Sequence, residues 1–228
     1  MVKFCKLFAL ATSVGALSLG MTANATVLEP GDAGVSIDTY MGSLGTIIAS
    51  GVDSSSATGA TTQFNGNFRY AVFLNEETGF LDFAYQFDND ASSTSSIGRL
   101  SFASFSGFDV SIFQTLEDVD GDGGIFLSGG QLAGTADRDG DSGVIGVDYV
   151  DDGTGGKIDG GENGGTIIIE TDATQYADGD CAAQNGVSDD TICLSPTVEA
   201  TAVPAPATLG LLGLGVMGLA AARRRKAS

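Results

Sequence analysis

The chain has 228 residues and no histidine, which excludes Ser-His-Asp and Cys-His catalysis, the common zinc sites and histidine-ligated haem. Its formal net charge is −19 at pH 7. All 29 acidic residues lie between residues 26 and 202, where only four basic residues oppose them, a net charge of −25. Such a surface repels the phosphate backbone, so nucleic acid is excluded as a partner. The four basic residues are Arg69, Arg99, Arg138 and Lys157.

Residues 1–25 have the pattern of a Sec signal peptide. Two lysines precede an uncharged, mostly apolar run over residues 7–21, and Ala23-Asn24-Ala25 forms an A-x-A cleavage site. We therefore expect export through the Sec translocon, cleavage by signal peptidase after Ala25 and a mature chain that starts at Thr26. The alternative is an uncleaved N-terminal membrane helix, which the short apolar run disfavours.

Residues 26–200 are expected to form one exported β-rich domain. After an irregular lead, residues 44–50 are a strand candidate and residues 54–62 are a polar loop. Apolar side chains then alternate along residues 68–74 and again along residues 80–87, across a short turn that contains glycine. Two runs of period two joined by such a turn predict a β-hairpin.

The second half of the body has strand-like pieces of weaker pattern. Residues 97–105 and 108–116 are predicted to pair around Ser106-Gly107. Residues 117–172 alternate short apolar pieces with Asp/Gly loops, which either continues the same sheets or, less favourably, forms a β-rich subdomain. The apolar pieces are residues 125–128, 144–150 and 166–171. No segment of the body has a 3.6-residue apolar period, so the predicted fold class is all-β, a two-sheet sandwich or jelly roll.

Two acidic loops are candidate calcium sites. Each places carboxylates at alternate positions near a glycine, as the start of a calcium loop does, and so many like charges repel one another unless a cation neutralises them. Gly129 at the twelfth position of the first loop excludes a true EF-hand. The alternative is a set of solvated turns, since Asp and Gly are good turn formers. The candidate Ca²⁺ ligands are Asp118, Asp120 and Asp122 in the first loop, and Asp137, Asp139, Asp141 and Asp148 in the second.

Two cysteines remain in the exported body. Cys181 and Cys193 have 11 residues between them, and in an oxidising compartment we expect them to form a disulfide. The loop between them contains Asn185-Gly186 and Asp189-Asp190, both of which are predicted to be turns. A redox role is the alternative, but the spacing is far from C-x-x-C.

The C-terminal residues 203–228 combine three features. Pro204 and Pro206 keep the first part extended, because proline fixes φ and disfavours helix at the residue before it. Sixteen residues without charge or proline follow, over 207–222. As a single transmembrane helix they would span about 24 Å, short of a bilayer core of about 30 Å. The basic cluster Arg223, Arg224, Arg225 and Lys226 should then remain in the cytoplasm.

This three-part tail resembles a PEP-CTERM sorting signal. The residues of the motif are Val203, Pro204, Ala205, Pro206, Ala207 and Thr208. The resemblance implies recognition and cleavage by a membrane enzyme of the exosortase class, in an exported envelope or cell-surface protein of a Gram-negative bacterium that makes extracellular polysaccharide. Ala205 stands where Glu is usual in that signal. The alternative is a C-terminal membrane anchor that is never cut.

Three classes of function follow from these features. The leading expectation is a non-enzymatic structural or extracellular-matrix-associated protein at the cell surface, in contact with extracellular polysaccharide. The first alternative is a calcium-dependent adhesion or carbohydrate-binding module built on the acidic loops. The second is a carboxylate-dependent glycoside hydrolase, which needs two acids about 5–9.5 Å apart in a cleft. The sequence singles out no such pair, and with no tryptophan the sugar-stacking surfaces would have to come from tyrosine.

Overall fold

The computed structural model describes residues 25–121, 124–150 and 156–198, and every regular element within them is a β-strand. The strands are β1 (Thr26–Val27), β2 (Val35–Ser36), β3 (Asp38–Thr39), β4 (Thr46–Thr58), β5 (Gln63–Leu74), β6 (Leu81–Asn89), β7 (Arg99–Phe102), β8 (Val110–Thr115), β9 (Thr135–Arg138), β10 (Ile145–Asp148), β11 (Thr166–Thr171), β12 (Tyr176–Gln184) and β13 (Ser188–Pro196).

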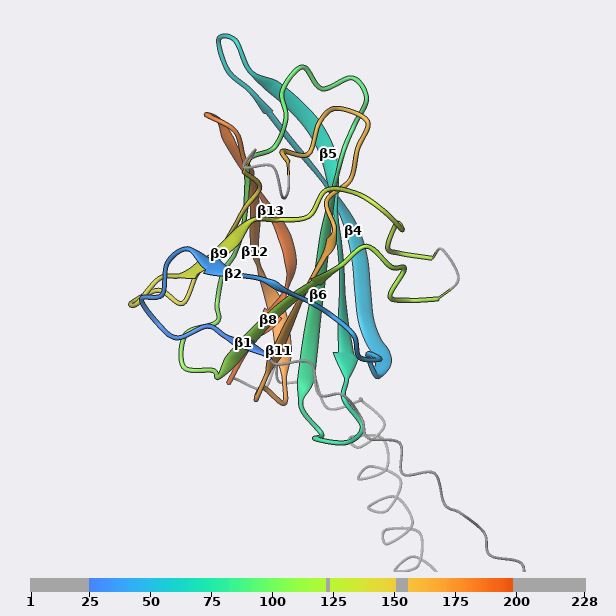
Figure 1. Ribbon diagram of the computed structural model, residues 1–228, viewed down its shortest axis with the longest axis vertical. Helices are drawn as coiled ribbons and strands as arrows, with labels where there is room; N and C mark the ends of the chain where they lie inside the picture. Colours follow the sequence, from blue (N-terminus) through green and yellow to red (C-terminus); the bar gives the residue numbers. More distant parts are fainter. Residues whose placement is uncertain (1–24, 122–123, 151–155, 199–228) are drawn as a thin grey trace, which may run out of the picture.

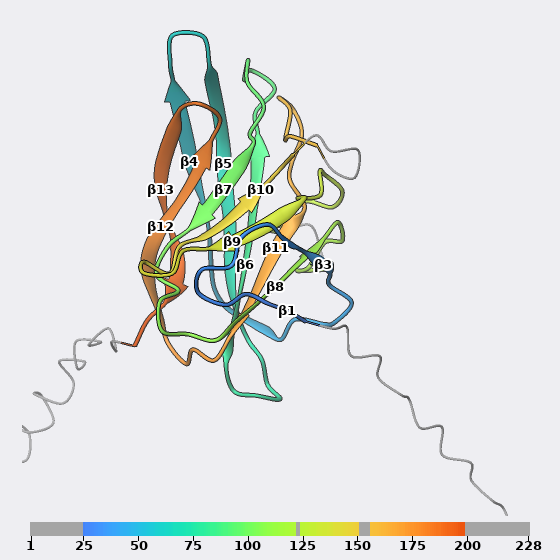
Figure 2. The ribbon, with the colours of Figure 1, turned by 60° about the vertical axis from the view of Figure 1, so that its left-hand side comes forward.

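The strands form two sheets that lie face to face (Figures 1 and 2). The first sheet has the order β1-β8-β11-β6-β5-β4, with β3 also pairing with β8, and the second has the order β13-β12-β7-β10-β9-β2. All pairings are antiparallel except that of β3 with β8. The all-β prediction with two sheets is therefore confirmed for the described residues.

The main core lies between the two sheets. The predicted hairpin is β5 and β6, and its turn closes where the Asn75 amide donates to the Phe80 carbonyl oxygen. Alternation along these strands turns one set of apolar side chains inward. Tyr85 of β6 stacks on Phe102 of the second sheet with ring centroids 4.3 Å apart. The inward set of the hairpin comprises Phe64, Phe68, Tyr70, Val72, Leu81, Phe83, Tyr85 and Phe87.

A smaller apolar cluster covers the outer face of the first sheet. Phe73, Ala84 and Ile168 project outward from β5, β6 and β11, and the loop residues Tyr40 and Ile125 pack over them. The central part of the first sheet is thus buried on both faces, which explains why eight of the nine residues of β6 are buried. Strands covered on both faces lose the simple apolar–polar alternation.

The structure corrects the predicted pairing of residues 97–105 with 108–116. β7 pairs with β10 and β12 in the second sheet, whereas β8 pairs with β1, β3 and β11 in the first. The segment around Ser106-Gly107 therefore crosses from one layer to the other and does not close a hairpin. Alternation identifies a strand but not the sheet that receives it, because both sheets bury one face in the same core.

Two further predictions of local structure are wrong. Residues 54–58, predicted as part of a loop, extend β4, because the long β5 offers partners from Gln63 to Asn67 for these small, mostly polar residues. Residues 125–128 form no strand and lie in the loop that covers the outer face of the first sheet. By contrast, residues 166–171 form β11 as predicted, and β9, β10 and β11 join the same two sheets as the rest of the body.

Candidate functional site

In the first acidic loop, two aspartate side chains accept hydrogen bonds from the backbone of the same loop. Asp118 accepts a hydrogen bond from the Asp120 amide at 3.1 Å, and Asp120 accepts one from the Ile125 amide at 2.5 Å. Burial and the neighbouring Asp118 side chain raise the pKa of Asp120. The third predicted ligand, Asp122, lies outside the described residues.

The same loop is fastened to the outer face of the first sheet by two polar side chains. Arg69 of β5 is paired with Asp88 at 2.6 Å and donates to the carbonyl oxygen of Ile125 at 2.9 Å. Gln86 of β6 exchanges two hydrogen bonds of 2.8 Å with the backbone of Leu127. The loop therefore closes over the small outer cluster, and Asp118 and Asp120 shape the turn that lets it do so.

Two of the predicted ligands of the second loop bind an arginine. Asp137 of β9 accepts two hydrogen bonds from Arg99, at 2.6 and 2.8 Å, and Asp148 of β10 accepts a third at 2.9 Å. The hydrogen bonds that Arg99 donates to Asp137 contribute most to raising the pKa of Arg99. The guanidinium lies over Gly146, where a Cβ atom would overlap it. These carboxylates thus tie three neighbouring strands together.

The other two predicted ligands of that loop lie in a turn. Asp139 accepts hydrogen bonds from the amides of Asp141 and Ser142, at 2.9 and 2.6 Å, and from the Ser142 hydroxyl at 2.8 Å. These bonds lower the pKa of Asp139. Asp141 is exposed. Among the described residues, no three side chains of His, Cys, Asp or Glu are grouped so as to hold a metal ion. Calcium binding stays a prediction.

A carboxyl pair that the sequence reasoning missed lies on the outer face of the first sheet. Asp82 of β6 and Glu170 of β11 are directly opposite each other in the strand register. Asp82 is only 2% exposed, and burial together with Glu170 raises its pKa to about 7, although Asn75 donates a hydrogen bond to it at 3.4 Å. Burial and the same two acids raise the pKa of Tyr40 to about 12. The sequence did contain a signal for this pair, since each acid interrupts a run of apolar residues that forms a strand.

A shallow pocket of about 610 Å³ adjoins this pair. Glu170 lines it, as do Tyr40, Phe113 and the turn residues Glu76 and Glu77. Asp82 is not part of its lining. The pocket therefore reaches one carboxyl of the pair while the other stays beneath the surface.

A second pocket, of about 670 Å³, is lined in part by the buried Arg138. The guanidinium donates to the carbonyl oxygens of Leu28 at 2.8 Å and of Phe105 and Phe108 at 2.7 Å each. Burial lowers the pKa of Arg138. This side chain therefore cross-links the N-terminal segment to the segment that crosses between the layers.

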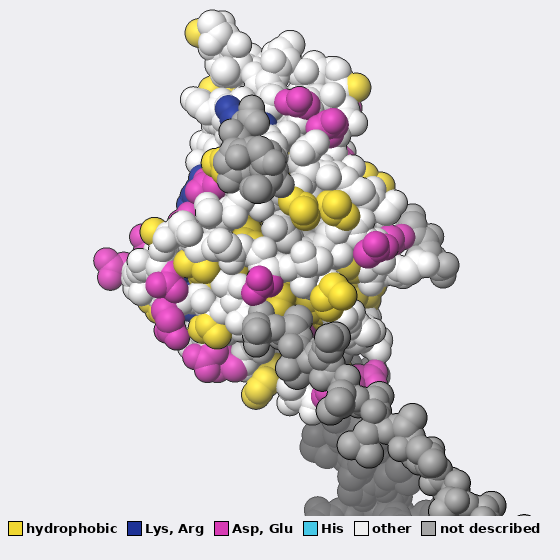
Figure 3. All heavy atoms as spheres, viewed as in Figure 1, with side chains coloured by type: hydrophobic (Ala, Val, Ile, Leu, Met, Phe, Trp, Pro, Cys, Tyr) yellow, Lys and Arg dark blue, Asp and Glu magenta, His cyan; other side chains and the backbone are white. Residues whose placement is uncertain are grey.

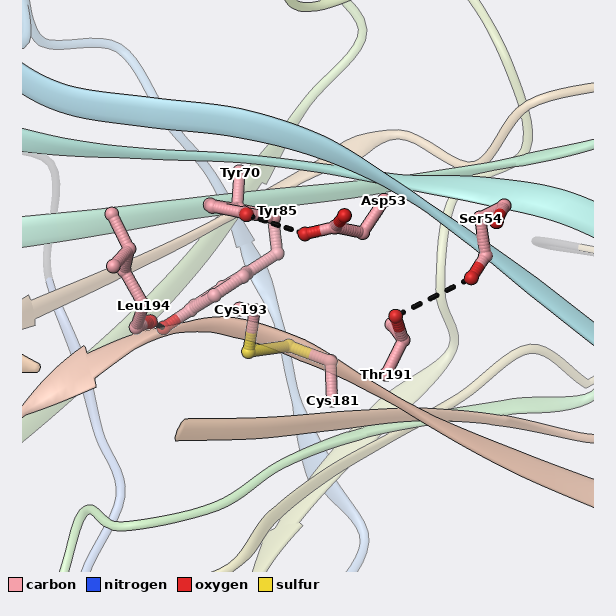
Figure 4. The surroundings of a disulfide bond; sticks show 8 residues. All are labelled: Asp53, Ser54, Tyr70, Tyr85, Cys181, Thr191, Cys193 and Leu194. Atoms are coloured by element: carbon pink, nitrogen blue, oxygen red, sulfur yellow. Dashed lines mark hydrogen bonds between the residues drawn. A yellow bond between two sulfur atoms is a disulfide. The ribbon is translucent and has the colours of Figure 1, made fainter. Parts of the chain in front are cut away.

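The predicted disulfide between Cys181 and Cys193 is confirmed, with a Cα–Cα distance of 5.8 Å (Figure 4). It joins β12 and β13, whose hairpin turns at Asn185-Gly186 as predicted. Asp189-Asp190, predicted as a second turn, lies within β13 and pairs with Ala183 and Ala182. Beside the disulfide, the Tyr85 hydroxyl donates to the carbonyl oxygen of Leu194 at 2.5 Å, so the first sheet is bonded to the second at this point.

The edges of the two sheets also meet near the disulfide. Asp189 of β13 accepts a hydrogen bond from the Ser56 amide of β4 at 2.8 Å, and the Thr191 hydroxyl donates to the Ser54 carbonyl oxygen at 3.4 Å (Figure 4). On the face drawn in Figure 3, Asp and Glu side chains are far more widespread than Lys and Arg side chains. The result is a cross-linked domain with an acidic surface.

The predicted signal peptide and the tail from residue 199 onward lie outside the described residues. Within the ranges that the structure describes, there is no helix with the length and apolar character needed to cross a membrane. No curated protein and no solved structure matches the chain. The family model of the PEP-CTERM protein-sorting motif matches residues 202–226, which confirms the resemblance of the tail. The chain therefore carries a PEP-CTERM protein-sorting motif, which implies an exported precursor that an exosortase-type enzyme processes for sorting to the cell surface.

Proposed function

We propose that this protein is a non-enzymatic structural component of the cell surface or extracellular matrix, exported as a membrane-anchored precursor. The sorting motif at residues 202–226 is the observation that carries the proposal. The signal-peptide pattern of residues 1–25 supports export through the Sec translocon, with cleavage by signal peptidase. The domain between these two ends then faces the outside of the inner membrane of a Gram-negative cell.

The use that the fold makes of its polar side chains supports a structural role. Asp137 and Asp148 bind Arg99, and Asp139 closes a turn. Among the tyrosines that could stack on sugars, Tyr85 and Tyr149 are buried in the core between the sheets. The fold itself thus uses these side chains, which supports a structural role.

The glycoside hydrolase alternative would rest on Asp82 and Glu170, the carboxyl pair with raised pKa values. A hydrolase must bring both acids into contact with the glycosidic bond. Asp82 is almost completely buried, and the adjoining pocket is lined by Glu170 without it. The burial of Asp82 favours a structural pair over a catalytic one.

The test of sorting is the intact mass of the protein isolated from the surface of the bacterium that produces it. We expect a form without residues 1–25 and without the basic cluster at residues 223–226, and a longer form when the exosortase is inactivated. The variant Ala205→Glu, which restores the residue usual in the motif, should increase the processed fraction, whereas Ala200→Glu adds the same charge outside it. A surface form that keeps residues 223–226 would contradict C-terminal processing.

The test of the structural role is incubation of the processed protein with the polysaccharide of its own host. We expect co-sedimentation and no release of reducing ends, with calcium or after chelation. If the protein does not bind under either condition, contact with polysaccharide is excluded. If reducing ends are released, the protein is an enzyme and the proposal is wrong.

A further inference from the structure

Two short strands, β1 and β3, lie end to end along the same edge of β8. β1 is antiparallel to β8 and places Thr26 beside Ile112, whereas β3 is parallel to β8 and places Asp38 beside Phe113. If β1 extended by one residue toward the N-terminus, Ala25 would pair with Phe113, but Asp38 already occupies that position. The chain cannot follow β8 in this direction beyond Thr26.

The carboxylate of Asp38 is in direct contact with Thr26. The Thr26 hydroxyl donates a hydrogen bond to Asp38 Oδ2 at 2.8 Å. The backbone nitrogen of a threonine is only three bonds away from its hydroxyl oxygen, so Asp38 also lies close to the nitrogen of Thr26. In the full chain this nitrogen is the amide that links Thr26 to Ala25.

The surroundings of this junction are rich in negative charge. Ala25 lines the 610 Å³ pocket together with Glu76, Glu77 and Glu170. The phenol of Tyr40 lines the same pocket. The titratable groups that face this region thus come from the β5–β6 turn, from β11 and from the segment after β3.

The structure describes all four basic side chains of the body, and each of them either binds other groups or lies beside another pocket. Arg69 pairs with Asp88, and Arg99 pairs with Asp137 and Asp148. Arg138 donates to backbone carbonyls, and Lys157 lines a third pocket with Asp159 and Glu162. Within the described residues, no Lys or Arg lines the pocket beside Ala25.

We propose that the junction of β1 and β3 is a binding site for the mature N-terminus of this same chain, with Asp38 as its counter-ion. The inference rests on the proposed export, because signal peptidase must hydrolyse the Ala25–Thr26 bond. Water adds across that bond, leaving a carboxylate on Ala25 and an amino group on Thr26, which takes up a proton at neutral pH. The new ammonium then lies beside Asp38 and at the edge of the acidic pocket.

Cleavage would thus stabilise β1, the edge strand at which the mature chain begins. The ion pair should raise the pKa of the Thr26 amino group above the range of about 7.7–8.0 that is usual for such groups. A raised pKa of a basic group means that its contribution to stability is complete below the unfolded pKa and is lost as pH rises through the folded one. Because Asp38 is exposed, the pair is a screened surface pair of modest strength.

The experiment uses the processed protein isolated from the cell surface. Its N-terminus is first mapped by sequencing, and its amino groups are then labelled by ¹³C reductive methylation and titrated by NMR. We expect the pKa of the Thr26 amino group to lie about half a unit above that of the Asp38→Asn variant. High salt should reduce the difference. Asp190→Asn removes the same charge from an exposed position of β13 and should leave this pKa unchanged.

The outcomes separate this inference from the proposed function. Retention of residues 1–25 would contradict the cleavage by signal peptidase that the proposed function includes, and the inference with it. An N-terminus at a residue other than Thr26 would overturn the inference alone. The same holds for an amino group at Thr26 whose pKa is equal in the parent and in Asp38→Asn.

Discussion

The buried carboxyl of Asp82 should make the protein less stable as pH rises. Its pKa is raised from 3.8 to about 7 by burial and by Glu170, so the folded state keeps a proton that the unfolded state releases between these two pH values. Three pKa units at 1.36 kcal/mol each correspond to about 4 kcal/mol as an upper bound. This stability is fully present below about pH 4 and is lost as pH rises through about 7.

The variant Asp82→Asn tests this reasoning, because an amide of the same shape carries no charge at any pH. We expect the variant to be more stable than the parent at pH 8, by up to about 4 kcal/mol, and the difference to shrink toward pH 4. The measurement is urea unfolding of the processed protein, followed by circular dichroism at pH values from 4 to 8.

Glu77→Gln is the matched control for Asp82→Asn. Glu77 lies in the adjoining turn and lines the same pocket, but it is exposed. This variant should follow the parent across the pH range. The reasoning is refuted if Asp82→Asn and the parent depend on pH in the same way, or if the variant is the less stable of the two at pH 8.

Three other predictions follow from the cross-links and the acidic loops. Replacing Cys181 and Cys193 together by Ala should lower the free energy of unfolding by about 3 kcal/mol, and a urea midpoint equal to that of the oxidised parent would contradict this. Arg138→Met leaves three backbone carbonyls, two of them buried, without their donor and should cost about 3 kcal/mol in the same assay, whereas an unchanged midpoint would mean that these bonds contribute nothing net. Calorimetric titration of calcium into the chelator-treated protein should give heat and a higher melting temperature if the first acidic loop binds the ion; the absence of both refutes calcium binding.

The sequence was sufficient wherever the signal is local. The β5–β6 hairpin was predictable because its apolar side chains alternate over a long stretch on both sides of a short turn. The disulfide was predictable because the body contains two cysteines and no others. The sorting motif combines a proline element, an apolar run and a basic cluster that are contiguous in the chain, and the family model recognises the same residues.

The acidic loops show what a local signal leaves open. Alternating Asp residues suggest a shared cation, yet Asp137 and Asp148 face Arg99, which is about 40 residues or more away from each of them in the sequence. Asp82 and Glu170 were overlooked for the same reason, since the two acids become neighbours only when β11 pairs with β6. A pattern of residue types states which charges are present but not which distant charges they meet.

Sequence information alone was therefore enough for the C-terminal sorting motif, the all-β class and the strongest strands, because charge, hydropathy and alternation are properties of neighbouring residues. The tertiary structure was needed to assign β7 and β8 to different sheets, to place Arg99 between two aspartates and to bring Asp38 to Thr26. Each of these depends on strand pairing between distant segments. The packing of both sheets on one core selects those pairings, and no local pattern encodes them.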